Sequence, residues 1–254
     1  MILWVKNMKI ISWNINGFES LIRDKYFDEI LDQEPDILCL QEVKCKKELP
    51  AIEGYNIYNY PSTKAGSGVA VYSKIKAKKT KKGIRSVKFD IEGRVLTLTF
   101  PDFDLITVYS PSGAGNERLC DKYEFYDRFT NFLRKSEKPL IICGDFNRIS
   151  QDIDAKNPDE MRKKPGFLPQ EEMWFKGILN SGYIDAFRYF HEDNEKFTWW
   201  PYSRNARELN NGLRLDYFLV DKQLEDLLKD SVILENQYGS DHAPIVLELD
   251  LTNK

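Results

Sequence analysis

The segment Lys9-Ile10-Ile11-Ser12-Trp13-Asn14-Ile15-Asn16-Gly17 decides the fold, because an apolar run typical of a buried strand ends directly in polar side chains. Apolar runs also lead into four other polar motifs: Leu40-Gln41-Glu42, Gly144-Asp145-Phe146-Asn147, Arg214-Leu215-Asp216-Tyr217 and Ser240-Asp241-His242. Polar groups delivered by strand ends can converge on one rim of a sheet. We therefore expect one site with many oxygen ligands and one imidazole, which suits a hard divalent cation and a phosphoryl group.

Composition indicates a chain that can fold unaided. Its 254 residues could form one large domain or two small ones, and 42% hydrophobic and 13% aromatic residues are ample for a packed core. No linker, low-complexity segment or clear repeat divides it, so we expect a single domain over residues 1–254. No run approaches the roughly 18 apolar residues of a membrane span, and Met1–Met8 is too short for a signal peptide's apolar region. We expect a cytoplasmic protein without a membrane partner.

Cysteine and histidine usage argues against a zinc site. Cys39, Cys45, Cys120 and Cys143 lack C-x-x-C spacing, and two of them lie inside apolar runs, so we expect free thiols rather than disulfides or a zinc cluster. The chain has only 2 histidines, which is too few for a multi-histidine zinc site.

The net charge of −3 argues against nonspecific coating of nucleic acid, but positive charge is concentrated locally. The clusters are Lys44–Lys47, Lys76–Lys82, Arg162–Lys164 and Arg204 with Arg207 and Arg214. Lys76–Lys82 is most simply a solvated loop. Aromatic residues precede the arginine group, which favours a nucleic-acid surface there.

Eight apolar or alternating runs have the pattern of strands. They are Lys9–Trp13, Ile37–Leu40, Val69–Tyr72, Val95–Phe100, Leu105–Tyr109, Leu140–Cys143, Leu215–Val220 and Ile245–Leu249. The fourth and fifth runs flank Pro101-Asp102-Phe103-Asp104, whose turn composition predicts an antiparallel hairpin.

Three helices are expected between the strands. Apolar residues spaced four apart predict one helix over 18–31 that stops before Pro35, and a second helix has its buried stripe at Leu119, Tyr123, Tyr126, Phe129 and Leu133. The third helix begins at Pro169, with Gly182 beyond its end. A hairpin among alternating helices and strands predicts a mixed α/β sandwich with helices outside packed sheets. The long charged loop Ser150–Gly166 suits a binding loop.

Glu42 directly follows the apolar run Ile37–Leu40, where a carboxylate is costly to bury unless it binds a cation or pairs with Lys44. Taken alone, Glu42 fits a salt bridge to Lys44 as well as it fits a metal site. Asn14, Asp145 and Asp241 occupy equivalent positions at strand ends, and together they favour metal binding.

Gly144-Asp145-Phe146-Asn147 could be an ordinary turn, since Gly, Asp and Asn all favour turns. In a functional interpretation, Asp145 accepts a proton from an attacking water, and the Asn147 amide orients that water or donates to a phosphate oxygen. General acid-base catalysis accelerates a reaction by only roughly 10²- to 10⁴-fold. Most of the acceleration should therefore come from the cation and from hydrogen-bond donors.

Ser240-Asp241-His242 does not suit a serine hydrolase, because adjacent strand residues point to opposite faces and the chain has no G-x-S-x-G elbow. His242 fits better as a phosphate contact. A carboxylate such as Asp216 would fix its tautomer and favour the protonated ring.

With those residues identified, the chain resembles the exonuclease III family of apurinic/apyrimidinic endonucleases, within the endonuclease/exonuclease/phosphatase superfamily. The resemblance extends from Lys9 to Leu249. Besides the motifs above, its ordered segments are Leu40-Gln41-Glu42-Val43-Lys44, Ser67-Gly68-Val69-Ala70, Gly166-Phe167-Leu168-Pro169-Gln170-Glu171, Arg214-Leu215-Asp216-Tyr217-Phe218 and Gly239-Ser240-Asp241-His242-Ala243-Pro244-Ile245.

The resemblance implies a four-layer α/β sandwich that depends on Mg²⁺, with Mn²⁺ as a substitute. It implies cleavage of double-stranded DNA on the 5′ side of an abasic site, often with 3′–5′ exonuclease or 3′-phosphodiesterase activity, and we expect a monomer. Family starts lie close before the first strand, so Met8 could be the initiator and residues 1–7 an extension.

Site roles transfer by position. Glu42 resembles the main metal carboxylate, with Asn14 and Asp241 near it and Asp145 and Asn147 as further candidate ligands. Asp145 resembles the water-activating base, Asn147 and Tyr109 the phosphate contacts, and Asp216 the partner of His242. An apolar pocket for the extruded sugar is implied at Trp199, Leu213 and Leu215, although ordinary core packing would also explain these residues. Expected DNA contacts are Lys44, Ser112, Arg204, Arg207 and Arg214.

Three residues depart from the family pattern. Ser112 replaces the usual Asn of Tyr109-Ser110-Pro111-Ser112-Gly113, Leu213 stands where a Trp is usual, and Gly66 where an aromatic often precedes Ser67. These departures bear on substrate preference and leave the catalytic set intact.

Two other classes of function are weighed against the endonuclease. The first is a phosphatase acting on inositol phosphates or sphingolipids, or a nonspecific deoxyribonuclease, which share the Glu, Asp-x-Asn and Asp-His elements. The second is a non-catalytic DNA-binding module that kept the fold, although here none of the expected catalytic positions is missing.

Overall fold

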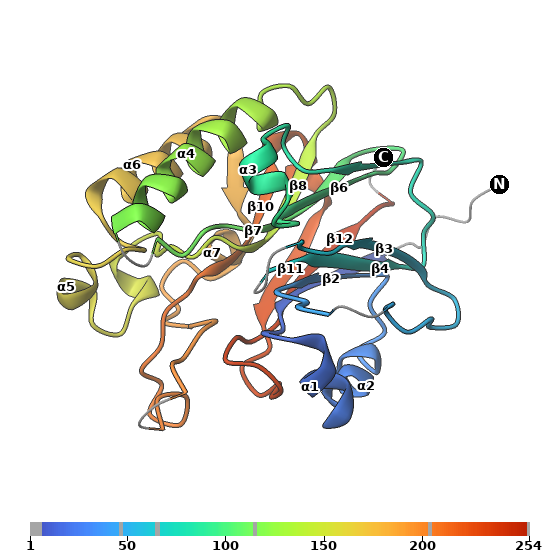
Figure 1. Ribbon diagram of the computed structural model, residues 1–254, viewed down its shortest axis with the longest axis horizontal. Coiled ribbons are helices and arrows are strands. Elements are labelled where there is room, and N and C mark those ends of the chain that lie inside the picture. Colours follow the sequence, from blue (N-terminus) through green and yellow to red (C-terminus); the bar gives the residue numbers. More distant parts are fainter. Residues whose placement is uncertain (1–6, 46–47, 64–66, 114–115, 203–204, 253–254) are drawn as a thin grey trace.

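Two packed β-sheets form the centre of the molecule, and helices cover their outer faces (Figure 1). The computed structural model describes residues 7–45, 48–63, 67–113, 116–202 and 205–252. Each sheet has six strands and contains both parallel and antiparallel pairs. The four-layer α/β sandwich expected from the sequence is confirmed.

The first sheet holds the amino-terminal strand near its centre. Its order is β11 (Leu228–Ile233), β12 (Ile245–Asp250), β1 (Asn7–Asn14), β2 (Ile37–Gln41), β4 (Val69–Ser73) and β3 (Asn56–Tyr60). β1 pairs in parallel with β2. Both strands therefore end at the same edge of the sheet, which brings Asn14 and the residue after Gln41 close together.

The second sheet delivers the remaining polar motifs. Its order is β5 (Lys79–Lys82), β6 (Val95–Thr99), β7 (Asp104–Tyr109), β8 (Leu140–Asp145), β10 (Asp216–Asp221) and β9 (Tyr183–Asp185). β7 and β8 run in parallel, with Tyr109 opposite Asp145. β10 runs antiparallel to β8, so it begins where β8 ends, with Asp216 opposite Asp145.

Apolar residues divide into three layers because alternate side chains of a strand face opposite sides of a sheet. One cluster, including Cys39, Val71 and Phe218, lies between the sheets. The outer face of the first sheet is covered by α1 (Phe18–Arg23) and α2 (Tyr26–Leu31). The outer face of the second is covered by α3 (Val87–Asp90), α4 (Asn116–Leu133) and α6 (Pro169–Asn180).

All eight strands expected from the sequence are present, as is the hairpin of β6 and β7. Four further strands, β3, β5, β9 and β11, were not expected from the sequence. These are the outermost strands of the two sheets. An edge strand buries less apolar surface and carries a weaker period-two pattern. β5 shows this most clearly, since its sequence Lys-Thr-Lys-Lys is exposed throughout and was interpreted as a solvated loop.

The single helix expected over 18–31 is wrong. The chain breaks between α1 and α2, where Lys25 adopts a left-handed conformation at φ 64°. This break shifts the buried face, so Leu21 and Phe27 are buried while Ile22 is 42% exposed. The other two helices are confirmed as α4 and α6.

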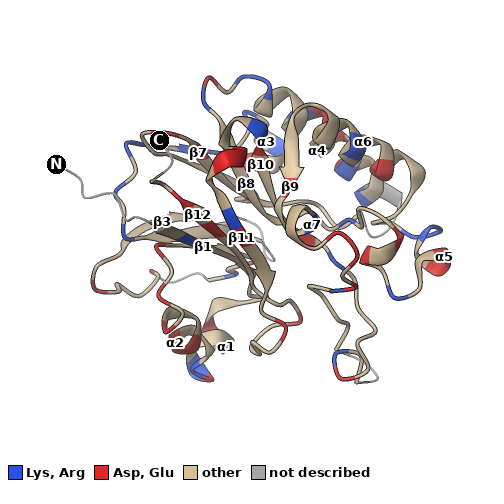
Figure 2. Ribbon diagram, turned by 180° about the vertical axis from the view of Figure 1, so that it is seen from behind, with Lys and Arg blue, Asp and Glu red and all other residues tan. Residues whose placement is uncertain are grey.

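Short helical segments occupy the remaining connections. The expected loop Ser150–Gly166 contains η1 (Asp152–Asp154) and α5 (Pro158–Met161), and α7 (Ala186–Phe190) and η2 (Lys222–Leu227) follow later. Figure 2 shows acidic and basic residues scattered over both sheets and the helices. Among the described residues, no helix combines the length and apolar character that a membrane crossing requires. All four cysteines are free, and Cys39 and Cys143 are buried.

Candidate active site

The polar motifs meet where the rims of the two sheets face each other. Asn14 ends β1 in the first sheet and Asp145 ends β8 in the second. The buried Asn14 amide donates from Nδ2 to Asp145 Oδ2 at 2.9 Å and to Glu42 Oε1 at 2.8 Å. Asn14 therefore joins the two sheets and holds two carboxylates near one another.

Asp145 is almost completely buried, at 1% exposure. Its Oδ1 accepts the Asn147 main-chain N–H at 2.7 Å, and its Oδ2 accepts Asn147 Nδ2 at 3.2 Å. Burial raises the pKa of Asp145 to about 7; the charge of His242 opposes this shift and the carboxylates of Asp216 and Glu42 add to it. A carboxyl group with a pKa near neutral is well matched to accepting a proton from water.

His242 lies between two carboxylates. Its Nδ1 is 2.9 Å from Asp216 Oδ2, and its Nε2 is 3.8 Å from Asp145 Oδ2. Burial lowers the pKa of His242, but the hydrogen bond and charge of Asp216, with the charge of Asp145, raise it overall to about 10. The ring is therefore a cation at neutral pH. The partnership of Asp216 and His242 expected from the sequence is present.

Asp241 and Lys44 are linked through Asn16. Asn16 Nδ2 donates to Asp241 Oδ1 at 3.0 Å, and Lys44 Nζ donates to Asn16 Oδ1 at 2.5 Å. Lys44 Nζ also lies 2.6 Å from Glu42 Oε2. Asn16 was not among the residues expected at the site, although its place two residues after Asn14 in the same motif was a usable signal.

Tyr109 reaches the same rim from β7. Burial raises the pKa of its phenol well above the usual range, and the negative charges of Glu42 and Asp145 add to the shift, so the group remains a hydrogen-bond donor. Arg94 holds Tyr109 in place, because Nη1 donates to its main-chain oxygen at 3.1 Å and the guanidinium lies 5.0 Å from the ring centre. Arg94 was also missed in the sequence.

Four residues of this rim turn sharply out of their strands. Asn16, Glu42, Lys44 and Asn147 have φ values of 46°, 50°, 49° and 50°. Left-handed backbone is uncommon outside glycine and tends to persist where surrounding contacts over-determine it, often at functional sites. Here it turns the chain at the end of three different strands toward one point.

The three residues expected to form a sugar pocket do lie together. Trp199 and Leu213 form a β-bridge, and both pack with the buried Leu215 against Ile149 and Phe167. Trp199 Nε1 donates to Asp241 Oδ2 at 3.0 Å. The apolar cluster therefore adjoins the polar rim, with Trp199 at the boundary.

Arg214 is not a DNA contact, so that prediction is wrong. Its side chain is fully buried, with Nε 2.7 Å from Asp154 Oδ1 and Nη2 2.6 Å from Asp185 Oδ2. Both carboxylates also accept second bonds from the same guanidinium. The arginine instead ties the start of β10 to η1 and β9.

Arg207 also acts within the protein. Its Nη1 donates to the main-chain oxygen of Ser240 at 3.0 Å, and its Nη2 donates to those of Glu235 and Gln237 at 2.8 and 2.6 Å. Its terminal nitrogens anchor the segment that leads to Asp241, and because the side chain is only half-buried, its role in DNA contact stays a prediction. Arg204, Gly66, residues 1–6 and the last two lysines of Lys44–Lys47 lie outside the described residues.

The oxygen atoms of the rim fit a cation. Lys44 Nζ lies against Glu42 Oε2 and Asn16 Oδ1, so these oxygens already stabilise one positive charge. Asp145, Asp216 and His242 also present ligand atoms within 4.8 Å of one another. Because His242 is protonated, that second group is less suited to a metal ion than the oxygens around Glu42.

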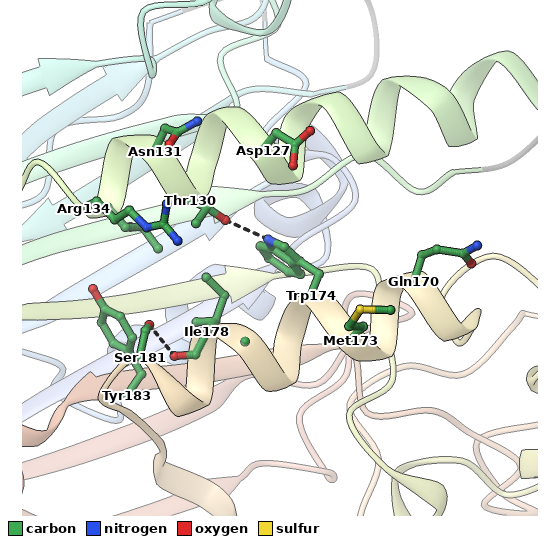
Figure 3. Close-up of a pocket in the computed structure, with 12 residues that line it drawn as sticks. Asp127, Thr130, Asn131, Arg134, Gln170, Met173, Trp174, Ile178, Ser181 and Tyr183 are labelled. Carbon is green, nitrogen blue, oxygen red and sulfur yellow. Dashed lines mark hydrogen bonds between the residues drawn. The ribbon is translucent and has the colours of Figure 1, made fainter.

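A separate groove of about 700 Å³ lies between α4 and α6, lined by residues that include Thr130, Trp174 and Ile178 (Figure 3). Trp174 Nε1 donates to Thr130 Oγ1 across it at 2.9 Å. None of the candidate site residues lines this groove.

The arrangement agrees with comparisons to known proteins. The model of the endonuclease/exonuclease/phosphatase family matches residues 11–242. The chain belongs to this family. Within it, the chain is 38% identical to an exodeoxyribonuclease of Bacillus subtilis (strain 168), over 96% of this chain and 100% of that protein. It is 41% identical to the DNA repair nuclease APEX1 of Danio rerio, over 96% and 82% of the two chains.

Solved structures in the family share the fold. An AP endonuclease from Archaeoglobus fulgidus superposes with a TM-score of 0.87 at 26% identity, covering 96% of this chain and 100% of that one. The resemblance to the exonuclease III type of nuclease, expected from the motifs, is therefore confirmed.

Proposed function

We propose that this chain is a DNA repair endonuclease that hydrolyses the phosphodiester on the 5′ side of an abasic site in double-stranded DNA. The observation that carries the proposal is the pairing of Asp145, whose pKa is raised to about 7, with the protonated His242 held by Asp216. A base and a cationic donor on one rim suit attack of water on a phosphodiester. The names of the relatives, a DNA repair nuclease and an AP endonuclease, support the same assignment.

The chain's own groups divide the chemistry. Asp145 accepts a proton from the attacking water, whose oxygen bonds to phosphorus while the bond from phosphorus to the 3′ oxygen of the preceding nucleotide breaks. The departing oxygen takes up a proton from solvent and becomes the 3′-hydroxyl. His242, Tyr109 and the Asn147 amide donate to phosphate oxygens as negative charge develops there. General acid-base catalysis alone accelerates the reaction by roughly 10²- to 10⁴-fold, so these donors and the cation supply most of the rate acceleration.

We assign the cation to Glu42, with Asn14 and Asp241 beside it and Asp145 and Asn147 as adjoining oxygen donors. Mg²⁺ is the ion that suits this carboxylate and amide set, and Mn²⁺ can replace it. When bound, the ion neutralises negative charge on the phosphoryl and leaving oxygens. Lys44, which pairs with Glu42, is the residue that would contact a DNA phosphate beside this set.

Substrate choice falls to the apolar cluster of Trp199, Leu213 and Leu215. A sugar without a base costs less to extrude from the duplex, and apolar walls favour it over a nucleotide that carries a polar base. Ser112, with a half-buried side chain beside the rim, is a shorter phosphate donor than the Asn usual in the family. Some 3′–5′ exonuclease or 3′-phosphodiesterase activity accompanies the main reaction, and the protein acts as a single-domain monomer.

The test is an analysis of products from a labelled duplex with one central abasic site, alongside a soluble inositol phosphate. The proposal expects a 3′-hydroxyl end immediately 5′ to the lesion and no phosphate from the inositol phosphate. Phosphate release without nicking would establish the phosphatase alternative. Metal-independent DNA binding without cleavage would establish a non-catalytic module.

A further inference from the structure

Lys122 and Glu171 form an ion pair whose side chains are both 0% exposed, with Nζ and Oε1 2.5 Å apart. Lys122 lies in α4, and Glu171 lies in the first turn of α6. A buried ion pair seldom stabilises a fold more than apolar side chains of similar volume, so its presence asks for another explanation. The explanation lies in what else the two side chains contact.

The three donors of the Lys122 ammonium have three acceptors, and two of these are main-chain oxygens at the candidate active site. Nζ donates to the Asn147 oxygen at 2.8 Å and lies 3.5 Å from the Ser112 oxygen. Asn147 follows β8, and Ser112 follows β7. One buried cation therefore holds both of the loops that leave the parallel strands of the second sheet.

The position of the Asn147 carbonyl matters because the same residue makes two hydrogen bonds to Asp145. Asn147 has φ 50°, and its main-chain N–H and side-chain amide both donate to Asp145. Its Nδ2 also donates to the Ser110 oxygen at 3.0 Å. The carbonyl, the main-chain N–H and the side chain all branch from the same Cα, so a shift of Asn147 as a whole away from Lys122 would also carry its amide groups away from Asp145.

Glu171 extends the same support to the apolar cluster. Its Oε2 accepts the main-chain N–H groups of Gly166 and Leu168 at 2.7 and 2.9 Å. Phe167, between them, packs in the cluster with Leu215. The ion pair thus connects the loop that carries Asn147 with the loop that closes the pocket.

We propose that Lys122 is a positioning residue for this site: its bond to the Asn147 carbonyl sets the Asn147 amide and the Asp145 carboxylate in their working geometry, and Glu171 holds the lysine there. The proposal rests on the proposed function for its catalytic consequence. A displacement of about 1 Å in a catalytic group can cost on the order of 10²-fold in rate. Lys122 itself touches no substrate.

The variants are Lys122→Met and the double variant Lys122→Met/Glu171→Gln. The single variant leaves a buried carboxylate without its cation and loses stability. The double variant removes that charge and recovers most of the melting temperature. Lys88→Met is the matched control, because Lys88 contacts α4 through exposed ion pairs with Asp121 and Glu124.

Single-turnover cleavage of an abasic duplex and affinity for the uncut duplex in chelator are measured for each protein. The double variant should lose at least about 10-fold in rate, with affinity within about two-fold of the parent, since only the reacting geometry is disturbed. Recovery of the rate together with the melting temperature would overturn the proposal, as would a loss of affinity that matches the loss of rate.

A second readout separates this proposal from the proposed function. The side-chain amide of Asn147 is followed by ¹H–¹⁵N NMR, identified by its loss in Asn147→Ala, with Asn56 in β3 as a distant reference. The Asn147 signal should move in the double variant while the Asn56 signal stays. If the parent failed to cut the abasic duplex, the proposed function would fall, and an unmoved Asn147 signal alone would overturn the positioning role.

Discussion

His242 Nδ1 lies 2.9 Å from Asp216 Oδ2, and both side chains are almost completely buried. Burial lowers the pKa of an imidazole, yet this contact, together with the charge of Asp145, raises that of His242 to about 10. The folded-state pKa therefore exceeds the ordinary value near 6.5. The pair contributes stability that is present in full below that ordinary value and is lost as the pH rises toward 10.

Replacing Asp216 by Asn should make cleavage depend on pH between 6 and 9. Without the carboxylate, burial lowers the pKa of His242 and the ring becomes neutral within this range, so the single-turnover rate should fall by about 10-fold or more as the pH rises. The parent rate should not fall. An NMR titration of His242 checks the cause, with Asp221→Asn on the same strand as control. A ring that stays protonated to pH 9 in Asp216→Asn would contradict this account.

Asp145→Asn tests the base. The amide keeps the shape of the carboxylate but cannot take a proton, so turnover should fall by at least roughly 10²-fold while affinity for uncut DNA is retained. Single-turnover rates with Mg²⁺ and binding in chelator measure the two quantities separately. A near-parental rate would remove Asp145 from the role of base.

Leu213→Trp tests the pocket. Leu213 packs beside Trp199 and Leu215, and a leucine leaves a smaller wall than the tryptophan usual in the family. The parent should therefore admit base-bearing nucleotides more readily than Leu213→Trp, and the ratio of abasic to undamaged cleavage should rise in the variant. Equal ratios for the two proteins would show that this wall does not set selectivity.

Asp154→Asn tests acid stability. Burial opposes ionisation of Asp154, but Arg214 and Arg188 outweigh it and lower the pKa of this carboxyl below its usual value. Because the folded-state pKa is lowered, its contribution to stability is present above about pH 4 and is lost as the pH falls through the folded-state pKa. In urea unfolding, Asp154→Asn should be less stable than the parent at pH 7. Below pH 4 its free energy of unfolding should change less with pH than that of the parent. Asp152→Asn, at an exposed position, is the control. If the free energy of unfolding of Asp154→Asn fell with pH below 4 as steeply as that of the parent, the prediction would be refuted.

The sequence predicted the centre of the molecule better than its margins. Central strands such as β2 and β8 are buried throughout, so their sequences are largely apolar and predict strands directly. The four missed strands are the sheet edges, where one partner is absent and alternation is weak. The break at Lys25 was also invisible, because a left-handed residue leaves the local composition of a helix unchanged.

The site shows the same division. Polar motifs next to apolar runs identified Asn14, Asp145 and His242, because Asn14 and Asp145 end β1 and β8 and His242 lies just before β12. Arginines were harder to place, since the sequence does not show which carboxylates face them. Arg214 was taken for a surface group, and only the fold reveals Asp154 and Asp185 on either side of it. Lys122 was missed for the same reason, because its partners come from other elements.

The measurement that tests the central claim most directly is single-turnover cleavage of one labelled duplex with a central abasic-site analogue, with Mg²⁺ or with chelator, beside an undamaged duplex. We predict a Mg²⁺-dependent nick immediately 5′ to the lesion and little cutting of the control. Equal cutting of both duplexes, or cutting that persists in chelator, would contradict a metal-assisted endonuclease directed to abasic sites.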